Sequence, residues 1–300
     1  MKILISGASG LVGSALSRVL RADGHTVARL VRPGGRVSTG DVRWDPASAM
    51  VETGAMEGVQ AVVHLSGASI ADGRWTGSRK AALRSSRVDS TRLLVDAMTR
   101  MQQKPSVLVC ASATGYYGDR GEEALAETSE PGTDFLALLA RDWEAEAMRA
   151  SAAGIRTVML RFGVVFAAEG GALPKMLMPF RFGVGGRIGN GRQWMPWIAL
   201  EDAVGVARAA ITDGRFAGPV NTVSPNPVRN IDFTRIAARA LHRPAIFAVP
   251  IFALRAALGE MAKPLLLAST RVVPERLMAM GYAFRFAEVE AALQEIVRRK

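Results

Sequence analysis

Residues 6–16 read SGASGLVGSAL and place three glycines, Gly7, Gly10 and Gly13, between an apolar run and an amphipathic stretch. The run KILIS (2–6) is typical of a buried strand. Residues 11–24 have helical apolar spacing and end at Gly24, a common helix stop signal. Glycines at such a turn let a ligand approach the backbone, and the helix N-terminus offers free N–H groups to a phosphate. The stretch therefore predicts a dinucleotide site whose pyrophosphate contacts come from Gly7, Ser9, Gly10, Leu11, Val12 and Gly13.

The spacing of these glycines is G-x-x-G-x-x-G, whereas the commonest dinucleotide fingerprint is G-x-G-x-x-G. A glycine trio alone is weak evidence, and a purely structural turn is the alternative. Its position between an N-terminal strand and a helix is what favours the binding site.

The first half of the chain alternates apolar strands with amphipathic helices. Strands are expected at 26–31, 60–66, 106–112 and 156–162, and helices at 79–103 and 133–152. This alternation predicts the α/β class, with a doubly wound parallel sheet and helices on both faces.

After Gly163 the pattern changes. Residues 167–198 are rich in Gly, Pro and Met, with little periodicity. Helices are then expected at 201–213, 231–241, 251–260 and 287–299, with strands at 219–223 and 245–249. We therefore predict a dinucleotide-binding domain at 1–165, to which a strand near 218–223 returns, and a smaller, interleaved C-terminal α/β lobe at 166–300.

Composition excludes several classes of function. The formal charge is +11, but the basic residues are scattered and their longest cluster is the terminal RRK, so we expect no nucleic-acid partner. No apolar run approaches the length of a membrane span, and MKILISG continues directly into a strand rather than into a signal peptide. The single Cys110 fits a reducing compartment. We expect a cytoplasmic protein with no membrane partner and no metal site.

The end of the second strand indicates which dinucleotide binds. An NAD site usually places an acidic residue there for the ribose 2′-hydroxyl, whereas an NADP site uses a cation for the 2′-phosphate. Here the sequence is ARLVRPGG, without an acidic residue and with Arg32 at the tip. The cofactor is therefore predicted to be NADP(H), unless Arg32 is only a surface loop residue.

These motifs are found together in one known family. The chain resembles the extended, atypical branch of the short-chain dehydrogenase/reductase superfamily, and more closely the "epimerase family" proteins that carry a C-terminal domain of unknown function. The stretches GASGLVG, HLSGASIADGRWT, SATGYYGD, LRFGVVF and GGALPKMLMPFRFGVGGRIGNGRQWMPW carry the resemblance, which covers nearly the whole chain.

The resemblance implies a Rossmann domain of about seven strands with a C-terminal substrate lobe. It also implies NADP(H) contacts by Arg32, Leu65, Ser66, Gly67, Arg87 and Arg161. The ends of parallel strands are where doubly wound sheets bind ligands, which independently favours Leu65 and Ser66. Arg87 and Arg161 are alternatively salt-bridged surface residues, and we interpret His64 as a packed strand residue rather than a base.

The catalytic pair of the superfamily is missing. Most members use a Tyr as the general acid/base and a Lys four residues later, which shares its helix face and lowers the phenol pKa. The corresponding positions in DFLALLARDWEAEA (134–147) are Leu136 and Ala140, and no tyrosine of the chain has Lys at i+4. The remaining catalytic candidates follow a strand in ASATGYYG, namely Ser112, Thr114, Tyr116 and Tyr117, with Arg120 or Arg161 to lower a phenol pKa.

Two functional hypotheses stay open. In the first, an enzyme with relocated chemistry acts as an oxidoreductase or epimerase on a small carbonyl or sugar-like substrate, and the two tyrosines otherwise only shape the pocket. In the second, a non-catalytic NADP(H)-binding protein serves as a redox sensor or partner-binding module. Residues 170–197 are interpreted as a loop that closes over the cofactor, or else as an ordered surface loop. Its Lys175, Arg181, Arg187 and Arg192 favour an anionic substrate. The superfamily often dimerises through helices that correspond to 79–103 and 133–152, so a homodimer is also expected.

Overall fold

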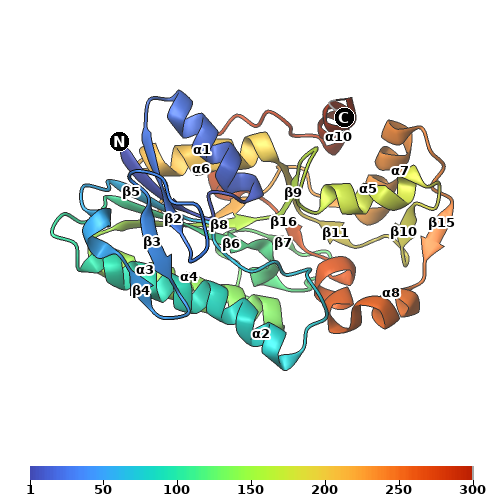
Figure 1. Ribbon diagram of the computed structural model, residues 1–300. Helices are drawn as coiled ribbons and strands as arrows, with labels where there is room; N and C mark the ends of the chain where they lie inside the picture. The colour runs from blue at the N-terminus through green and yellow to red at the C-terminus, as the bar shows by residue number, and fades with distance from the viewer. Residues whose placement is uncertain (299–300) are drawn as a thin grey trace.

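The computed structural model describes residues 1–298, and its centre is an eight-stranded sheet (Figure 1). In sheet order the strands are β13 (Gly218–Thr222), β8 (Arg156–Phe162), β6 (Val107–Ala113), β5 (Ala61–His64), β1 (Lys2–Ser6), β2 (Thr26–Val31), β3 (Val42–Asp45) and β4 (Met50–Val51). Every neighbouring pair is parallel except β3 and β4. The predicted parallel sheet is confirmed, and β13 is the strand expected to return near 218–223.

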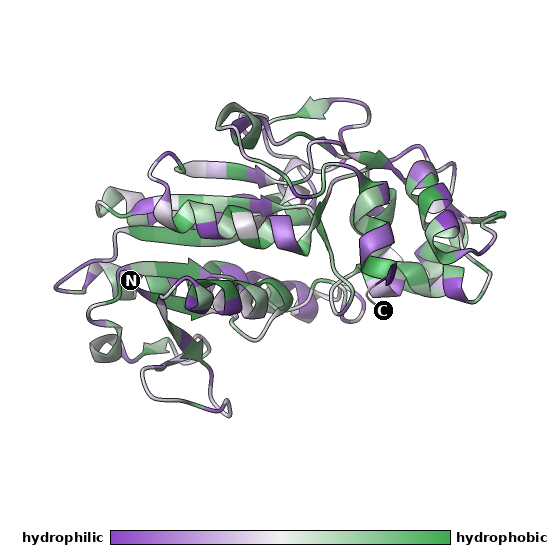
Figure 2. Cartoon of the chain, turned by 90° about the horizontal axis from the view of Figure 1, so that it is seen from above, coloured by the Kyte–Doolittle hydropathy of each residue, from purple (hydrophilic) through white to green (hydrophobic). Residues whose placement is uncertain are grey.

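Helices cover both faces of the sheet. On one face α1 (Leu11–Ala22) and α6 (Leu200–Thr212) share a core with Ile3 and Ile5 of β1. On the other face α3 (Ser90–Thr99) and α4 (Phe135–Ala152) pack around Leu4 of the same strand. Because both sides of each central strand are covered, the strands are nearly continuous apolar runs, and they are mostly green in Figure 2.

The C-terminal lobe lies beyond the carboxyl ends of the central strands (Figure 1). Its own core gathers Phe166, Leu177, Trp197 and Phe233. Apart from α6, the helices that follow β8 are α5 (Leu173–Arg181), α7 (Asn230–Leu241), α8 (Ile251–Leu258), η4 (Gly259–Met261), η5 (Lys263–Leu267), α9 (Glu275–Ala279) and α10 (Val289–Arg298). The short strands after β8 that lie outside the main sheet are β9 (Val164–Phe166), β10 (Gly186–Ile188), β11 (Trp194–Met195), β12 (Trp197–Ala199), β14 (Val228–Arg229), β15 (Phe247–Val249) and β16 (Arg271–Val272).

The interpretation of residues 170–197 as a loop is wrong for part of this block. Helix α5 forms there, and Leu173, Leu177 and Phe180 bury one face of it in the lobe core. Their spacing of four and three residues is helical, but the glycines on both sides and Pro179 inside the helix obscured it.

The other boundaries move by a few residues. The predicted helix at 79–103 is α2 (Gly77–Arg84), a π-helical turn η2 (Ser85–Asp89) and α3 in succession. The helix expected at 287–299 is observed as α10, and residue 299 lies outside the described residues. Three further short elements precede α4, namely η1 (Thr53–Met56), η3 (Thr114–Tyr117) and β7 (Ala124–Leu125).

The division of the chain at residue 165 stays a prediction, as do the homodimer and the cytoplasmic location. Between residues 1 and 298, no helix combines the length and the hydropathy needed to cross a membrane.

Candidate functional site

The glycine loop has the geometry that a pyrophosphate site needs. Gly7 has a φ of +69°, and its backbone lies so close to Leu65 that a Cβ would come within 2.8 Å of the Leu65 carbonyl group. A Cβ on Gly13 would lie 2.2 Å from the carbonyl oxygen of Gly7. Gly10 caps helix α1 without any side-chain hydrogen bond, and no acidic residue lies in the first turn. The N–H groups of this turn are therefore available to an anion.

The tip of β2 carries an unpaired cation. Arg32 is exposed, and within residues 1–298 its guanidinium has no recorded hydrogen bond or ion pair. The nearby acidic residue, Asp41, is occupied by Arg29, whose Nε lies 3.1 Å from Oδ2. This arrangement suits a phosphate better than a free ribose hydroxyl, which an acidic acceptor would bind.

The segment after β5 lies beside the glycine loop, as its predicted role requires. The amides of Leu65 and Ser66 donate to Ser6 Oγ at 3.1 and 3.3 Å, so strands β1 and β5 end together. Gly67 packs on the guanidinium of Arg87, which a Cβ would approach to 3.1 Å. Arg87 in turn donates to the carbonyl oxygen of Ala68 at 3.0 Å. Arg87 therefore stabilises the loop 65–68 through its contacts with Gly67 and Ala68. The alternative, that Arg87 is a salt-bridged surface residue, does not hold.

His64 is a packed strand residue, as interpreted. Its side chain is fully buried, and Nδ1 lies 2.6 Å from Ser6 Oγ. Burial, with the charge of Arg87 as the second cause, lowers its pKa to about 4. The hydroxyl of Ser6 accepts the two amides named above, so its proton points to Nδ1 and His64 is held neutral.

The start of the 170–197 block lies over the glycine loop. A Cβ on Gly171 would come within 2.9 Å of Leu11 Cδ2, at the first turn of α1. Farther along, Trp197 is fully buried and stacks on Phe166 with ring centroids 5.3 Å apart. The block therefore contacts the predicted cofactor site at one end and belongs to the lobe core at the other.

The two positions of the usual catalytic pair are filled by apolar side chains. Leu136 packs against Gly115, where an added Cβ would lie 3.4 Å from Leu136 Cβ, and Ala140 is buried. Neither position offers a proton-transfer group. One turn further along α4, Glu144 carries the only acidic side chain that the helix buries.

Glu144 is the centre of a buried polar network. Its Oε2 forms an ion pair with the Arg161 guanidinium at 2.7 Å, and its Oε1 accepts a hydrogen bond from Ser112 Oγ at 2.6 Å. Arg161 is 2% exposed and also donates to the Tyr117 hydroxyl at 2.8 Å and to the carbonyl oxygen of Glu127. Burial acts to lower the pKa of Arg161, but the hydrogen bonds and charge of Glu144 outweigh it and raise the pKa. Arg161 is thus an ion-paired interior residue rather than a surface one, and its contact with the cofactor stays a prediction.

The network also includes two catalytic candidates. Tyr117 is 0% exposed, its hydroxyl donates to Asn221 Oδ1 at 2.6 Å, and burial raises its pKa to about 12. Ser112 is buried and committed to Glu144. Both hydroxyl groups are thus engaged in hydrogen bonds within the interior, which disfavours a catalytic role for either. Thr114, also buried, donates to the carbonyl oxygen of Phe162 at 3.3 Å.

Tyr116 differs from these three residues. It is half-buried at the carboxyl end of β6, and its ring lies 3.5 Å from the Arg161 guanidinium carbon. Burial raises its pKa, while the charge of Arg161 acts in the opposite direction. Arg161 is the described side chain that interacts with its hydroxyl, and both the charge of Arg161 and a hydrogen bond from it favour the phenolate.

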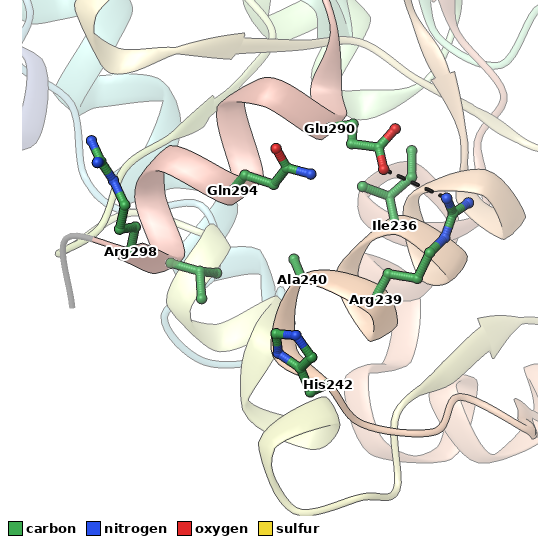
Figure 3. A pocket seen from close by; sticks show the side chains of 8 residues that line it. Ile236, Arg239, Ala240, His242, Glu290, Gln294 and Arg298 are labelled. Carbon is green, nitrogen blue, oxygen red and sulfur yellow. Dashed lines mark ion pairs between the residues drawn. The ribbon is translucent and has the colours of Figure 1, made fainter.

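A hollow elsewhere in the lobe has no connection to these residues. It lies between α7 and α10, where Arg239 and Glu290 pair at 3.5 Å above an apolar floor that includes Ile236 and Ala240 (Figure 3). None of the predicted site residues lines it. In the part of the chain that the structure describes, no cluster of side chains could hold a metal ion.

Comparison with known proteins identifies the family. Residues 3–223 match the NAD dependent epimerase/dehydratase family. The chain belongs to this family. Residues 249–296 match a C-terminal domain of unknown function, DUF1731. The resemblance inferred from the motifs is thereby confirmed.

Several relatives match along the whole chain. Epimerase family protein ML0860 of Mycobacterium leprae is 41% identical over 297 residues, which cover 99% of this chain and 96% of that protein. The crystal structure of human epimerase family protein SDR39U1 with NADPH has a TM-score of 0.88 at 32% identity and covers both chains completely. A nucleoside-diphosphate sugar epimerase from Corynebacterium glutamicum has a TM-score of 0.82 at 35% identity; the match spans all of this chain and 59% of that one.

Proposed function

We propose that this protein binds NADP(H) and catalyses an oxidoreductase or epimerase reaction on a small carbonyl or sugar-like substrate. The observation that carries the proposal is the uncapped N-terminus of α1 beside Gly7, together with the unpaired Arg32 at the tip of β2. The human relative solved with NADPH supports the same cofactor.

The residues present fit the parts of this cofactor. The first turn of α1 would hold the pyrophosphate, and Arg32 would pair with the 2′-phosphate. The loop Leu65–Gly67 would border the remainder, since it lies against Gly7. When bound, NADPH would supply the hydride of the reaction.

Tyr116 is the proton donor in this proposal. Of the four candidate hydroxyl groups, those of Ser112, Thr114 and Tyr117 are buried and donate to fixed acceptors. Like an ordinary tyrosine, the Tyr116 phenol is protonated at neutral pH and has a proton to give. Burial raises its pKa and disfavours the phenolate, and the charge of Arg161 acts against this effect. Arg161 against the ring would then stabilise the phenolate that is left.

The first prediction concerns the choice of cofactor. Arg32→Ala should weaken NADPH binding by roughly 10- to 100-fold, because a charge-assisted phosphate contact contributes about 1.5–3 kcal/mol. NADH binding should change little, since NADH has no 2′-phosphate. Fluorescence titration with both dinucleotides measures this, with Arg36→Ala as the control at a nearby exposed arginine. Equal losses for NADPH and NADH would refute the role of Arg32.

The second prediction concerns the proton donor. Tyr116→Phe keeps the ring on Arg161 but removes the acidic proton, so turnover should fall by roughly 100-fold or more while NADPH binding remains. Turnover would be followed as NADPH oxidation with a panel of small aldehydes, ketones and keto sugars. Tyr117→Phe is the matched control and should lose stability rather than turnover. Unchanged turnover in Tyr116→Phe would return Tyr116 to a packing role.

A non-catalytic NADP(H)-binding protein is the second candidate. Leu136 and Ala140 at the positions of the usual pair, and Ser112 held by Glu144, favour it. Tight NADPH binding, with neither NADPH oxidation by the panel nor epimerisation of sugar substrates in the presence of NADP(H), would support this candidate over the enzyme.

A further inference from the structure

A cationic cluster surrounds Trp194 on the lobe side of the candidate site. The guanidinium carbon of Arg229 lies 4.5 Å from the centre of the Trp194 ring, and that of Arg271 lies 5.2 Å from it. The indole N–H donates to Glu122 at 2.8 Å, and Arg229 pairs with the same carboxylate at 2.8 Å. Arg192 adds a further positive charge near Glu122. Within residues 1–298, Glu122 forms an ion pair with Arg229, and none is found between Glu122 and Arg271.

Arg271 is the member of this cluster that lacks a counter-charge. Its Nε is buried and has no hydrogen-bond partner, and within residues 1–298 no ion pair or side-chain hydrogen bond is recorded for its guanidinium. Arg271 is half-buried, and its contact with the Trp194 face fixes the guanidinium without supplying an acceptor for Nε. Because this Nε has no acceptor among the described residues, the guanidinium can bind an anion from outside the chain.

Hydrogen bonds connect this cluster to Tyr116. Thr270, next to Arg271, donates its amide to the carbonyl oxygen of Trp194 at 3.2 Å and its hydroxyl to the carbonyl oxygen of Gly118 at 3.0 Å. Gly118 closes the turn that carries Tyr116 and donates to Gly115 at 3.2 Å. The three short strands β7, β11 and β16 meet at this junction of sheet and lobe (Figure 1). The cluster and Tyr116 are thus held by the same turn.

We propose that Arg271, with Arg229 and Trp194, forms a subsite for an oxyanion, a phosphate or carboxylate group carried by the substrate. Guanidinium groups donate two parallel N–H bonds to such groups, which suits them better than a spherical anion. Trp194 fixes both guanidinium groups, so little side-chain entropy is lost when the anion binds. The assignment of this anion to the substrate rests on the proposed function, whereas the binding site itself does not.

The test is calorimetric titration of the full chain, without dinucleotide, with inorganic phosphate and separately with succinate, at constant ionic strength set by chloride. The expected result is saturable binding that falls by roughly tenfold or more in Arg271→Gln. Arg243→Gln, an exposed arginine elsewhere in the lobe, is the matched control and should bind like the wild type. The phosphate and succinate arms decide which oxyanion the subsite prefers.

The outcomes separate this inference from the proposed function. Phosphate also fits the predicted 2′-phosphate position beside Arg32, so Arg32→Ala is titrated in parallel, and the Arg271-dependent component should persist in it. Binding that is equal in the wild type and Arg271→Gln, or no saturable binding of either anion, would overturn the subsite. Arg271→Gln should bind NADPH with the affinity of the wild type. If the wild type itself does not bind NADPH, the proposed function is overturned, whereas the subsite is not.

Discussion

Arg161 and Glu144 show how one buried ion pair shapes this site. Their side chains are 3% and 9% exposed, and the pair also holds Ser112 and Tyr117. Removing one partner of such a pair typically costs about 3–5 kcal/mol, because the other charge stays buried without compensation. Replacing both by apolar groups costs much less. The pair is therefore a strong constraint on the orientation of the two tyrosines that follow β6.

Glu144→Gln should accordingly lower the free energy of unfolding by about 3 kcal/mol, measured by urea denaturation. Glu123→Gln removes an exposed partner of Arg120 and should cost under about 1 kcal/mol. The double variant Glu144→Leu, Arg161→Met should recover part of the loss. A Glu144→Gln protein as stable as Glu123→Gln would show that the interior charge is compensated in another way.

His64 gives a second prediction at this scale. Burial lowers its pKa from 6.5 to about 4, so the unfolded chain takes up a proton at a higher pH than the folded chain does. Stability conferred by neutral His64 is therefore complete above pH 6.5 and is lost as the pH falls toward 4. The free energy of unfolding should fall by about 1.4 kcal/mol for each unit by which the pKa is lowered, or by roughly 3 kcal/mol in total.

The measurement is a set of denaturation curves across this pH window for the wild type and His64→Gln. The difference between them should shrink as the pH falls, because carboxylate titration is common to both proteins. His242→Gln, at an exposed position, should follow the wild type throughout. A pH-independent difference for His64→Gln would mean that His64 does not titrate differently in the folded and unfolded states.

At the scale of the element, helix α1 depends on close backbone contact at its start. Gly13 lets the helix lie against Gly7, and Gly7 lies against Leu65 at the end of β5. Three chain segments thus meet with no side chain between them. The free N–H groups of the helix and the loop after β5 can reach one ligand only because of this contact.

Gly13→Ala should therefore weaken NADPH and NADH binding alike, and by at least tenfold, because the new Cβ would lie 2.2 Å from the carbonyl oxygen of Gly7. Titration with both dinucleotides and a thermal denaturation curve would detect the change. Gly77→Ala, at the first position of α2 with no atom within 4 Å of the added Cβ, is the matched control. Retained binding in Gly13→Ala would show that the loop tolerates displacement of α1.

At the scale of the whole molecule, the lobe completes the site at the carboxyl ends of the strands. Gly171 lies on Leu11, and Thr270 joins Trp194 to the turn of Tyr116. Arg74 and Lys80 in the segment before and within α2 reach the carbonyl oxygen of Ala256 and the carboxylate of Glu260. Residues separated by more than a hundred positions are therefore in contact where the sheet meets the lobe.

The sequence by itself determined the sheet and the glycine loop, and it predicted the cofactor. These depend on local patterns: apolar runs, helical spacing, glycines at one junction and the lack of an acidic residue beside Arg32. The absent Tyr–Lys pair was likewise readable, since i and i+4 share a helix face.

Only the tertiary structure decided which polar residues are buried and paired and which remain accessible. Tyr116 and Tyr117 are adjacent in sequence, yet one is half-buried beside Arg161 and the other is fully buried against Asn221. Arg161 and Arg271 have the same side chain, yet Glu144 neutralises the first and no described residue neutralises the second. Burial and charge pairing arise from residues distant in the chain, so no local pattern around an arginine or a tyrosine predicts them.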